Sequence, residues 1–134
     1  MTVRVTKRSA RMPASYTHDN GYIRDRYAGP VAIDELTAHW RVVLADPFVR
    51  ACGRSLADIR DVELTFIGTD LAAALRGVMA PQTPPGGWQV AVVVSRPIEM
   101  GIARQLQLLA GDLMRCRIFT DETEAAAWLL SDGA

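Results

Sequence analysis

Apolar residues recur at helical spacing in four stretches of the chain. In the first stretch, one stripe falls at offsets 0, 3, 7, 10 and 11, as on one face of an α-helix. Proline or glycine follows each of the first three stretches, where such residues end helices. The first stripe consists of Ile33, Leu36, Trp40, Val43 and Leu44. The spacing predicts helices over residues 32–45, 69–80, 97–110 and from 121 onward.

Shorter stretches show the patterns typical of strands. Two alternating runs flank the turn signal Asp19-Asn20-Gly21 and predict a β-hairpin. Val90–Val94 is a run of five apolar residues, which indicates a strand buried on both faces, as in a parallel sheet. The strands are predicted over residues 14–18, 22–28, 54–59, 88–94 and 115–119.

The predicted elements follow one another as β-β-α-β-α-β-α-β-α. This order predicts an α/β fold whose mixed sheet has mostly parallel central strands and an antiparallel N-terminal hairpin. The chain has 134 residues, enough for one domain with its own core. We expect this domain over residues 14–134, after a flexible basic tail of residues 1–13. The first twelve residues carry a charge of +4 from Arg4, Lys7, Arg8 and Arg11.

Composition narrows the classes of function. The 15 Lys and Arg residues balance the 15 Asp and Glu residues, which argues against a protein that grips nucleic acid or an anionic membrane by charge. The densest apolar run, Val90–Val94, is too short to span a membrane, and no apolar stretch after the basic start suggests a secretory signal. Cys52 and Cys116 lie far apart without metal-binding spacing, so we expect reduced thiols in a cytoplasmic protein.

Four strings together resemble a known family. They are HDNGYIRDRYAGPVAIDEL, SLADIRDVELT, WQVAVVVSRPIEMGIARQL and RIFTDETEAAAWL, which span about residues 14–131. In their order and spacing they resemble the STAS-like superfamily, in particular the bacterial SpoIIAA-like (anti-sigma-factor-antagonist-like) proteins. The resemblance implies a small regulatory or protein-binding module rather than an enzyme.

The sequence departs from this family at one segment. Anti-sigma-factor antagonists carry an Asp-Ser-Ser-Gly segment, whose serine a partner kinase phosphorylates, after the third strand. Residues 63–70 contain no serine here, and Thr69 is the nearest hydroxyl at a helix start. We interpret Thr69 as a helix cap, with a phosphosite as the alternative. This departure argues against partner switching by phosphorylation.

The carboxyl edge of the sheet is the expected binding site, because ligands of open parallel sheets bind there and helix N-termini attract anions. A protein partner at this edge is the leading hypothesis. The alternative is a small anionic or lipid-like ligand, with an apolar pocket under the second helix. Phosphate-binding glycine motifs are absent from the sequence, so the sequence does not predict nucleotide binding. The predicted edge residues are Asp61, Thr65, Thr69, Asp70, Ser95 and Arg96.

Other polar residues receive structural interpretations. Asp58, Asp61 and Glu63 resemble paired catalytic carboxylates, but nearby arginines predict salt bridges instead. His18 and His39 lack further ligands in a metal-binding pattern. We therefore predict no catalytic residue, no cofactor and no metal.

Two further interpretations concern Cys116 and self-association. Cys116 lies between two arginines, which would lower its pKa if they touched it, but strand geometry predicts a buried structural thiol. A further hypothesis is a homodimer through the free edge of the hairpin, anchored by Trp40 or Trp88.

Overall fold

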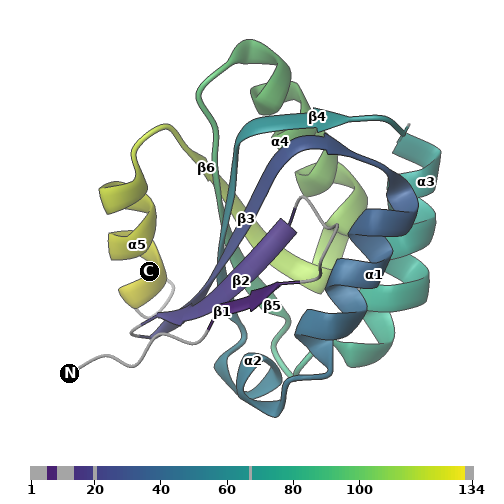
Figure 1. Ribbon diagram of the computed structural model, residues 1–134. Coiled ribbons are helices and arrows are strands. Elements are labelled where there is room, and N and C mark those ends of the chain that lie inside the picture. Colours follow the sequence, from purple (N-terminus) through teal and green to yellow (C-terminus); the bar gives the residue numbers. More distant parts are fainter. Residues whose placement is uncertain (1–5, 9–13, 20, 67, 132–134) are drawn as a thin grey trace.

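The sheet has six strands, which lie side by side in chain order (Figure 1). The computed structural model describes residues 6–8, 14–19, 21–66 and 68–131. The first three strands are antiparallel, and the last four are parallel to one another. The strands are β1 (Thr6–Arg8), β2 (Ala14–Asp19), β3 (Tyr22–Val31), β4 (Arg54–Leu64), β5 (Trp88–Val93) and β6 (Met114–Phe119). The predicted α/β fold with its antiparallel hairpin and parallel centre is confirmed.

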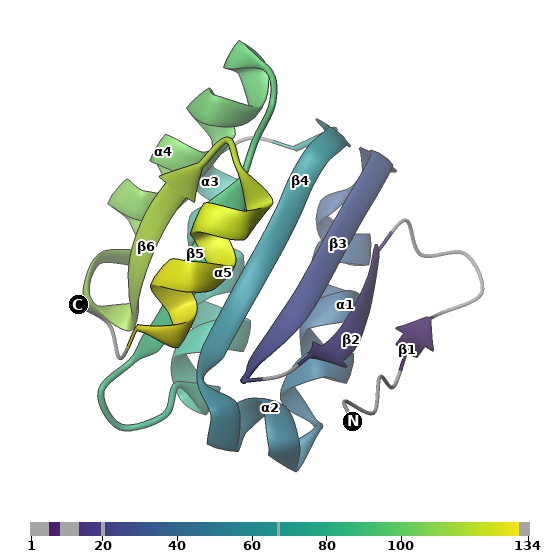
Figure 2. The same ribbon diagram turned by 90° about the vertical axis from the view of Figure 1, so that its left-hand side faces the viewer.

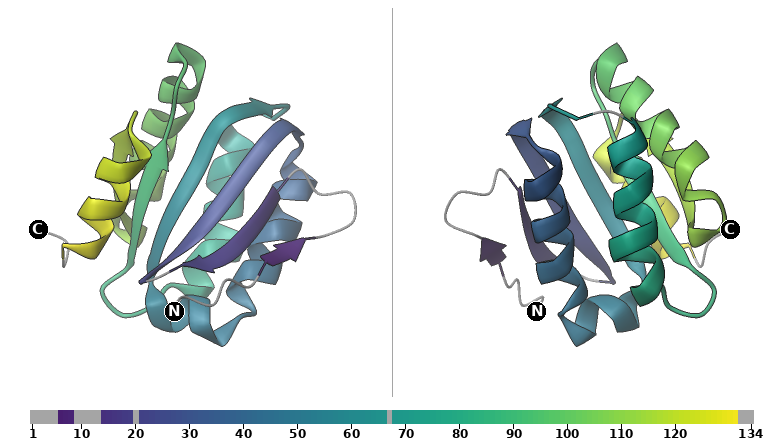
Figure 3. Two further views of the ribbon diagram at one scale, coloured as in Figure 1. Left: turned by 60° about the vertical axis from the view of Figure 1, so that its left-hand side comes forward. Right: turned by 90° about the vertical axis from the view of Figure 1, so that its right-hand side faces the viewer.

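Helices cover the two faces of the sheet unequally. Helices α1 (Ile33–Leu44), α3 (Gly68–Ala74) and α4 (Pro97–Ala110) lie on one face, and α5 (Glu122–Leu130) lies on the other (Figures 1 and 3). Helix α3 continues into a π-helical turn, Leu75–Met79, and then a 3-10 turn, Ala80–Gln82. Figure 2 shows α5 beside β4, β5 and β6, with β2 and β3 uncovered on that face. A further 3-10 turn, Gly111–Leu113, follows α4.

Three elements differ from the sequence prediction. The short helix α2 (Pro47–Cys52) was not predicted, because Asp46-Pro47 stops α1 and also starts α2. Asp46 caps α2 by accepting the Phe48 N–H at 2.9 Å. Strand β4 extends past residue 59 to Leu64, and β1 lies within the predicted tail. Because β1 pairs with β2, the hairpin is not the sheet edge; tail residues 1–5 and 9–13 lie outside the described residues.

The core has two parts, one on each face of the sheet. The larger part lies under α1, α3 and α4, and the smaller part lies under α5. Every residue of β5 is buried, as expected for a strand covered on both faces. Among the described residues, no helix is long and apolar enough to cross a membrane. The smaller core cluster consists of Tyr22, Leu56, Ala91, Val93, Ala125 and Leu129.

Candidate functional site

The carboxyl edge of the sheet brings several predicted site residues together. The Ser95 hydroxyl donates to the Arg60 carbonyl at 3.2 Å, and the Arg96 guanidinium donates to the Val62 carbonyl at 3.1 Å. The Thr65 hydroxyl donates to the carbonyl of Val31 at 3.3 Å. These contacts fasten the start of α4 to β4, and the segment after β4 to β3. Ser95, Arg96 and Thr65 therefore hold neighbouring backbone in place.

Glu99, which the sequence analysis did not single out, occupies the N-terminus of α4. Its fully buried carboxylate accepts the backbone N–H groups of Ser95 at 2.8 Å and Arg96 at 3.0 Å. The Ser95 hydroxyl, whose single hydrogen is shared with the Arg60 carbonyl, also lies 3.1 Å from this carboxylate, which pairs with the Arg96 guanidinium. Burial alone would raise the pKa of Glu99, but these hydrogen bonds outweigh burial and lower that pKa. The protein's own carboxylate thus fills the place where an external anion was expected.

The other predicted edge residues lie on β4 and in the first turn of α3. Asp61 lies 3.4 Å from the Arg26 guanidinium, and its side chain is largely exposed. Helix α3 begins at Gly68, so Thr69 lies inside the first turn and is not the N-cap that was predicted. Thr69 is exposed and Asp70 is half-buried. The start of α3 packs closely on α4, because a Cβ at Gly68 would overlap the Gln105 side chain.

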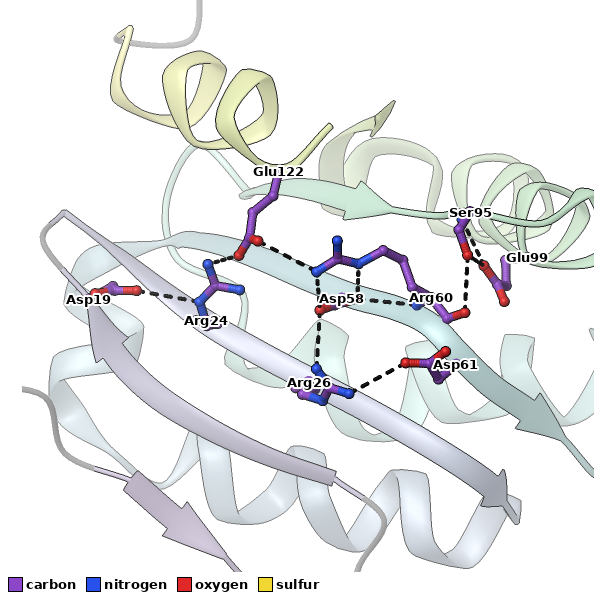
Figure 4. A network of polar contacts seen from close by, with 9 residues as sticks. All are labelled: Asp19, Arg24, Arg26, Asp58, Arg60, Asp61, Ser95, Glu99 and Glu122. Carbon is purple, nitrogen blue, oxygen red and sulfur yellow. Dashed lines mark hydrogen bonds and ion pairs between the residues drawn. The ribbon is translucent and has the colours of Figure 1, made fainter. Parts of the chain in front are cut away.

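A network of charged side chains lies on the face of the sheet that α5 leaves partly open (Figure 4). At its centre, buried Asp58 contacts Arg60 at 2.8 Å and Arg26 at 3.7 Å. Glu122, in the first turn of α5, pairs with Arg24 and lies 3.5 Å from Arg60. Burial alone would raise the pKa of Asp58, but the hydrogen bonds from Arg60 lower it. As predicted, Asp58 forms salt bridges, which link β3 to β4, whereas the contacts of Glu122 tie α5 to the sheet.

A second polar cluster is buried on the opposite face of the sheet. Asp25 of β3 accepts the Tyr27 hydroxyl at 2.7 Å, and His39 Nε2 lies 2.5 Å from the other Asp25 oxygen. The indole N–H of Trp40 donates to the Tyr27 oxygen at 3.1 Å. Burial alone would lower the pKa of His39, but the charge of Asp25 and the hydrogen bond to it raise that pKa. These side chains satisfy one another and join α1 to the sheet.

An apolar cavity of about 130 Å³ lies between the sheet and helices α1, α3 and α4. Most of its lining is hydrocarbon, from residues such as Leu36, Val43, Ile59, Leu71 and Leu106. Ala57 also lines it and is only half-buried, although β4 is a central strand beneath the helices. The cavity lies where the sequence predicts an apolar pocket, under the second predicted helix.

Polar groups reach the cavity at few places. Asp25, Tyr27 and Trp40 line it from the buried polar cluster, and Ser55 and Trp88 line it from β4 and β5. Trp88 is 3% exposed, and among the described residues its indole nitrogen has no hydrogen-bond partner. The prediction that Trp88 anchors a dimer interface is wrong, because the ring faces the interior of the protein.

Cys116 and the possible metal ligands show no features of a reactive or metal-binding site. Burial raises the pKa of Cys116 to about 11, so the alternative of a thiol activated by arginines is wrong. Arg115 and Arg117 alternate with Cys116 along β6 and point to the opposite face of the sheet. Within residues 6–8, 14–19, 21–66 and 68–131, no three His, Cys, Asp or Glu side chains gather to hold a metal ion.

Comparison with known proteins supports the fold. No family model matches the sequence, and no curated protein matches it. Among solved structures, an uncharacterized protein of the DUF3478 family from Shewanella loihica PV-4, with a SpoIIAA-like fold, is similar at a TM-score of 0.55. The two chains are 15% identical, and the match covers 96% of this chain and 93% of the other. The chain therefore has the SpoIIAA-like α/β fold that its sequence resembles.

Proposed function

We propose that this chain is a non-enzymatic binding module whose ligand is a small, mostly apolar molecule. The observation that carries the proposal is the cavity of about 130 Å³ between the sheet and helices α1, α3 and α4. A dry cavity of roughly 150 Å³ with a similar lining is large enough to bind benzene. Burial of apolar surface contributes about 25 cal/mol per Å², so a hydrocarbon that enters gains affinity from the lining alone.

The polar groups around the cavity support binding rather than catalysis. Asp25 is held by Tyr27 on one oxygen and by His39 on the other. His39 is buried and is not among the residues that line the cavity. These groups hold one another in place, so none of them is poised to attack a ligand or to exchange a proton with it.

The cavity is also a better binding site for a ligand than the carboxyl edge of the sheet. An anion at the start of α4 would have to compete with Glu99, whose carboxylate already accepts the backbone N–H groups of Ser95 and Arg96. Displacing a fully buried carboxylate would leave it without partners, at a large cost in free energy. We therefore place the ligand in the apolar interior.

Benzene binding tests the proposal directly. Amide chemical shifts are recorded during a benzene titration of the protein, and we expect the largest changes at residues that line the cavity. The variant Ala57→Leu should abolish these changes, because its added carbons occupy the cavity. The matched control Ala73→Leu lies on the exposed side of α3 and should bind benzene like the wild type. Unchanged binding by Ala57→Leu would contradict the proposal.

A regulatory protein partner at the carboxyl edge is the second candidate function. The first turn of α4 exposes Ile98 (67%) beside Ser95 and Arg96, and an exposed apolar side chain of this kind suits a protein contact. A partner captured by the wild type should be lost with Ile98→Asp and kept with Leu130→Asp, whose apolar side chain on α5 is also exposed. Equal capture by the two variants would remove this candidate.

A further inference from the structure

An open groove of about 270 Å³ lies where the end of α1 meets α2 and the turns that continue α3. The right-hand view of Figure 3 shows α1 and α3 side by side, with α2 at the end of α1. Three polar side chains line the groove: Arg41 from α1, Arg50 from α2 and Gln82 from the 3-10 turn. Among the described residues, no Asp or Glu lines it, so the charged side chains of the groove are all positive.

Neither of these guanidinium groups is neutralised by a carboxylate within the described part of the chain. The Arg50 guanidinium donates to the neutral side-chain oxygen of Gln82 at 3.3 Å, which links α2 to the 3-10 turn. Arg41 and Arg50 are both exposed. Four other arginines each pair with a carboxylate: Arg24, Arg26, Arg60 and Arg96. The groove therefore has two positive charges that the protein itself does not balance.

Two helix ends lie at this groove, and each carries about half a negative charge, which is less than the two full charges of the guanidinium groups. Carbonyls at these ends also have partners. The Arg41 carbonyl accepts the Ala45 N–H at 3.1 Å, and the Met79 carbonyl accepts the Thr83 hydroxyl at 3.0 Å. Asp46, the acidic residue that follows α1, is bound to side chains of β2 and to the first turn of α2. The groove thus remains positive overall.

We propose that this groove binds the phosphoryl group of a phosphate monoester. A guanidinium presents its N–H groups in a planar fork that matches two phosphate oxygens. A phosphate monoester carries a charge of about −1.5 to −2 near pH 7, which the two guanidinium charges balance, and it has three acceptor oxygens for Arg41, Arg50 and the amide NH₂ of Gln82. Val78 and Pro81 also line the groove and offer apolar surface to the organic part of the ester. This site is separate from the proposed function of the apolar cavity.

A titration with inorganic phosphate tests the site. Amide chemical shifts are recorded at constant ionic strength and about pH 8, where phosphate is mainly a dianion. We expect saturable changes that are largest at residues lining the groove, and no saturable change with chloride. Arg41→Gln and Arg50→Gln should each weaken phosphate about 3- to 10-fold. The matched control Arg104→Gln removes an exposed arginine from α4 and should change the affinity less than about 2-fold.

A third variant leaves both arginines in place. Gly77 lines the groove, and a Cβ at this position would meet no atom within 4 Å, so a side chain there does not disturb the packing. Gly77→Asp brings a negative charge to the groove and should weaken phosphate about 3- to 10-fold. The matched control Ala73→Asp adds the same charge on the exposed side of α3 and should change the affinity less than about 2-fold.

Two further probes identify the source of the phosphoryl group. Saturable binding of glycerol phosphate that depends on Arg41 and Arg50 supports a soluble ester. Capture by vesicles of phosphatidylcholine with phosphatidic acid, but not by phosphatidylcholine alone, supports a lipid headgroup in the same groove. If phosphate causes no saturable change, or if Arg41→Gln and Arg50→Gln weaken it no more than Arg104→Gln, the site is overturned. Benzene binding in the cavity does not depend on these arginines, so this inference and the proposed function can fail separately.

Discussion

Enlarging Ala57 is expected to stabilise the protein, which is unusual for a residue that faces a core. Ala57 lies on β4, faces α1, α3 and α4, and lines the cavity. Ala91 lies on the neighbouring strand β5 but faces α5, where it is fully buried in the smaller core cluster. The substitutions Ala57→Val and Ala91→Val add the same carbons to adjacent strands, on opposite faces of the sheet.

The structure sets the size of the expected effect. At about 24 cal/mol per Å³, a fully enclosed cavity of about 130 Å³ costs about 3 kcal/mol of lost packing, which is the upper limit here because the cavity is partly open. Each buried methylene contributes about 0.8 kcal/mol, so the added carbons of Ala57→Val should raise the free energy of unfolding by about 1.5 kcal/mol. Ala91→Val should instead lower it by about 1–3 kcal/mol, because its surroundings are already filled.

Urea denaturation of the two variants and the wild type measures these free energies. The shift in melting temperature gives an independent reading, at about 3–5 °C per kcal/mol for a domain of this length. If Ala57→Val destabilises the protein as much as Ala91→Val, the space beneath the helices is already filled. That result would refute the cavity and, with it, the proposed function.

The remaining predictions concern the buried titratable groups. Glu99→Gln should lower the free energy of unfolding by about 2–3 kcal/mol in urea denaturation, whereas exposed Glu63→Gln should change it by less than about 0.5 kcal/mol. The pKa values of Glu99 and Asp58 are lowered in the folded protein, so these ionised carboxylates stabilise the fold above the usual carboxyl pKa of about 4. This stabilisation is lost as the pH falls through the lower pKa values of the folded state. The urea midpoint should therefore fall from about pH 5 downward, and it should fall less in Glu99→Gln. The pKa of His39 is raised in the folded protein, so its protonated form stabilises the fold below about pH 6.5, and this stabilisation is lost as the pH rises through the pKa of the folded state. The small decrease in the free energy of unfolding at alkaline pH should be absent in His39→Gln. Cys116, whose pKa burial raises to about 11, should react with iodoacetamide at pH 8 at least 10-fold more slowly than free cysteine.

The fold was largely predictable because each main element carries its own periodicity and its own stop signal. Helix α1 follows one apolar stripe and ends before Asp46-Pro47, and β5 is one continuous apolar run. Helix α2 has six residues, too few for a periodic stripe to show. The second half of β4 was missed because its charged residues face the open side of the sheet, where the sequence looks like a loop.

The residues of the candidate site were harder to predict than the fold. Sequence patterns placed Ser95 and Arg96 at a helix start on the correct edge of the sheet. The carboxylate that satisfies them, Glu99, looks in the sequence like any acidic residue in a first helical turn. Its complete burial follows from the packing of α4 against β4, which no local pattern encodes. The sequence predicts an apolar pocket under the second predicted helix, but not its size or its lining, because side chains that line a gap have the same composition as side chains that fill a core.

The contrast between the start of α4 and the cavity is the strongest reason to look for function inside the protein rather than at its edge. At the start of α4, one buried carboxylate accepts the N–H groups of Ser95 and Arg96, so the donors of this turn have partners. A ligand at this turn would have to displace Glu99, whose fully buried carboxylate would then lack partners. The volume of about 130 Å³ between the sheet and helices α1, α3 and α4 holds no side chain of the described residues. A ligand with a hydrocarbon surface gains packing there without displacing any group of the protein.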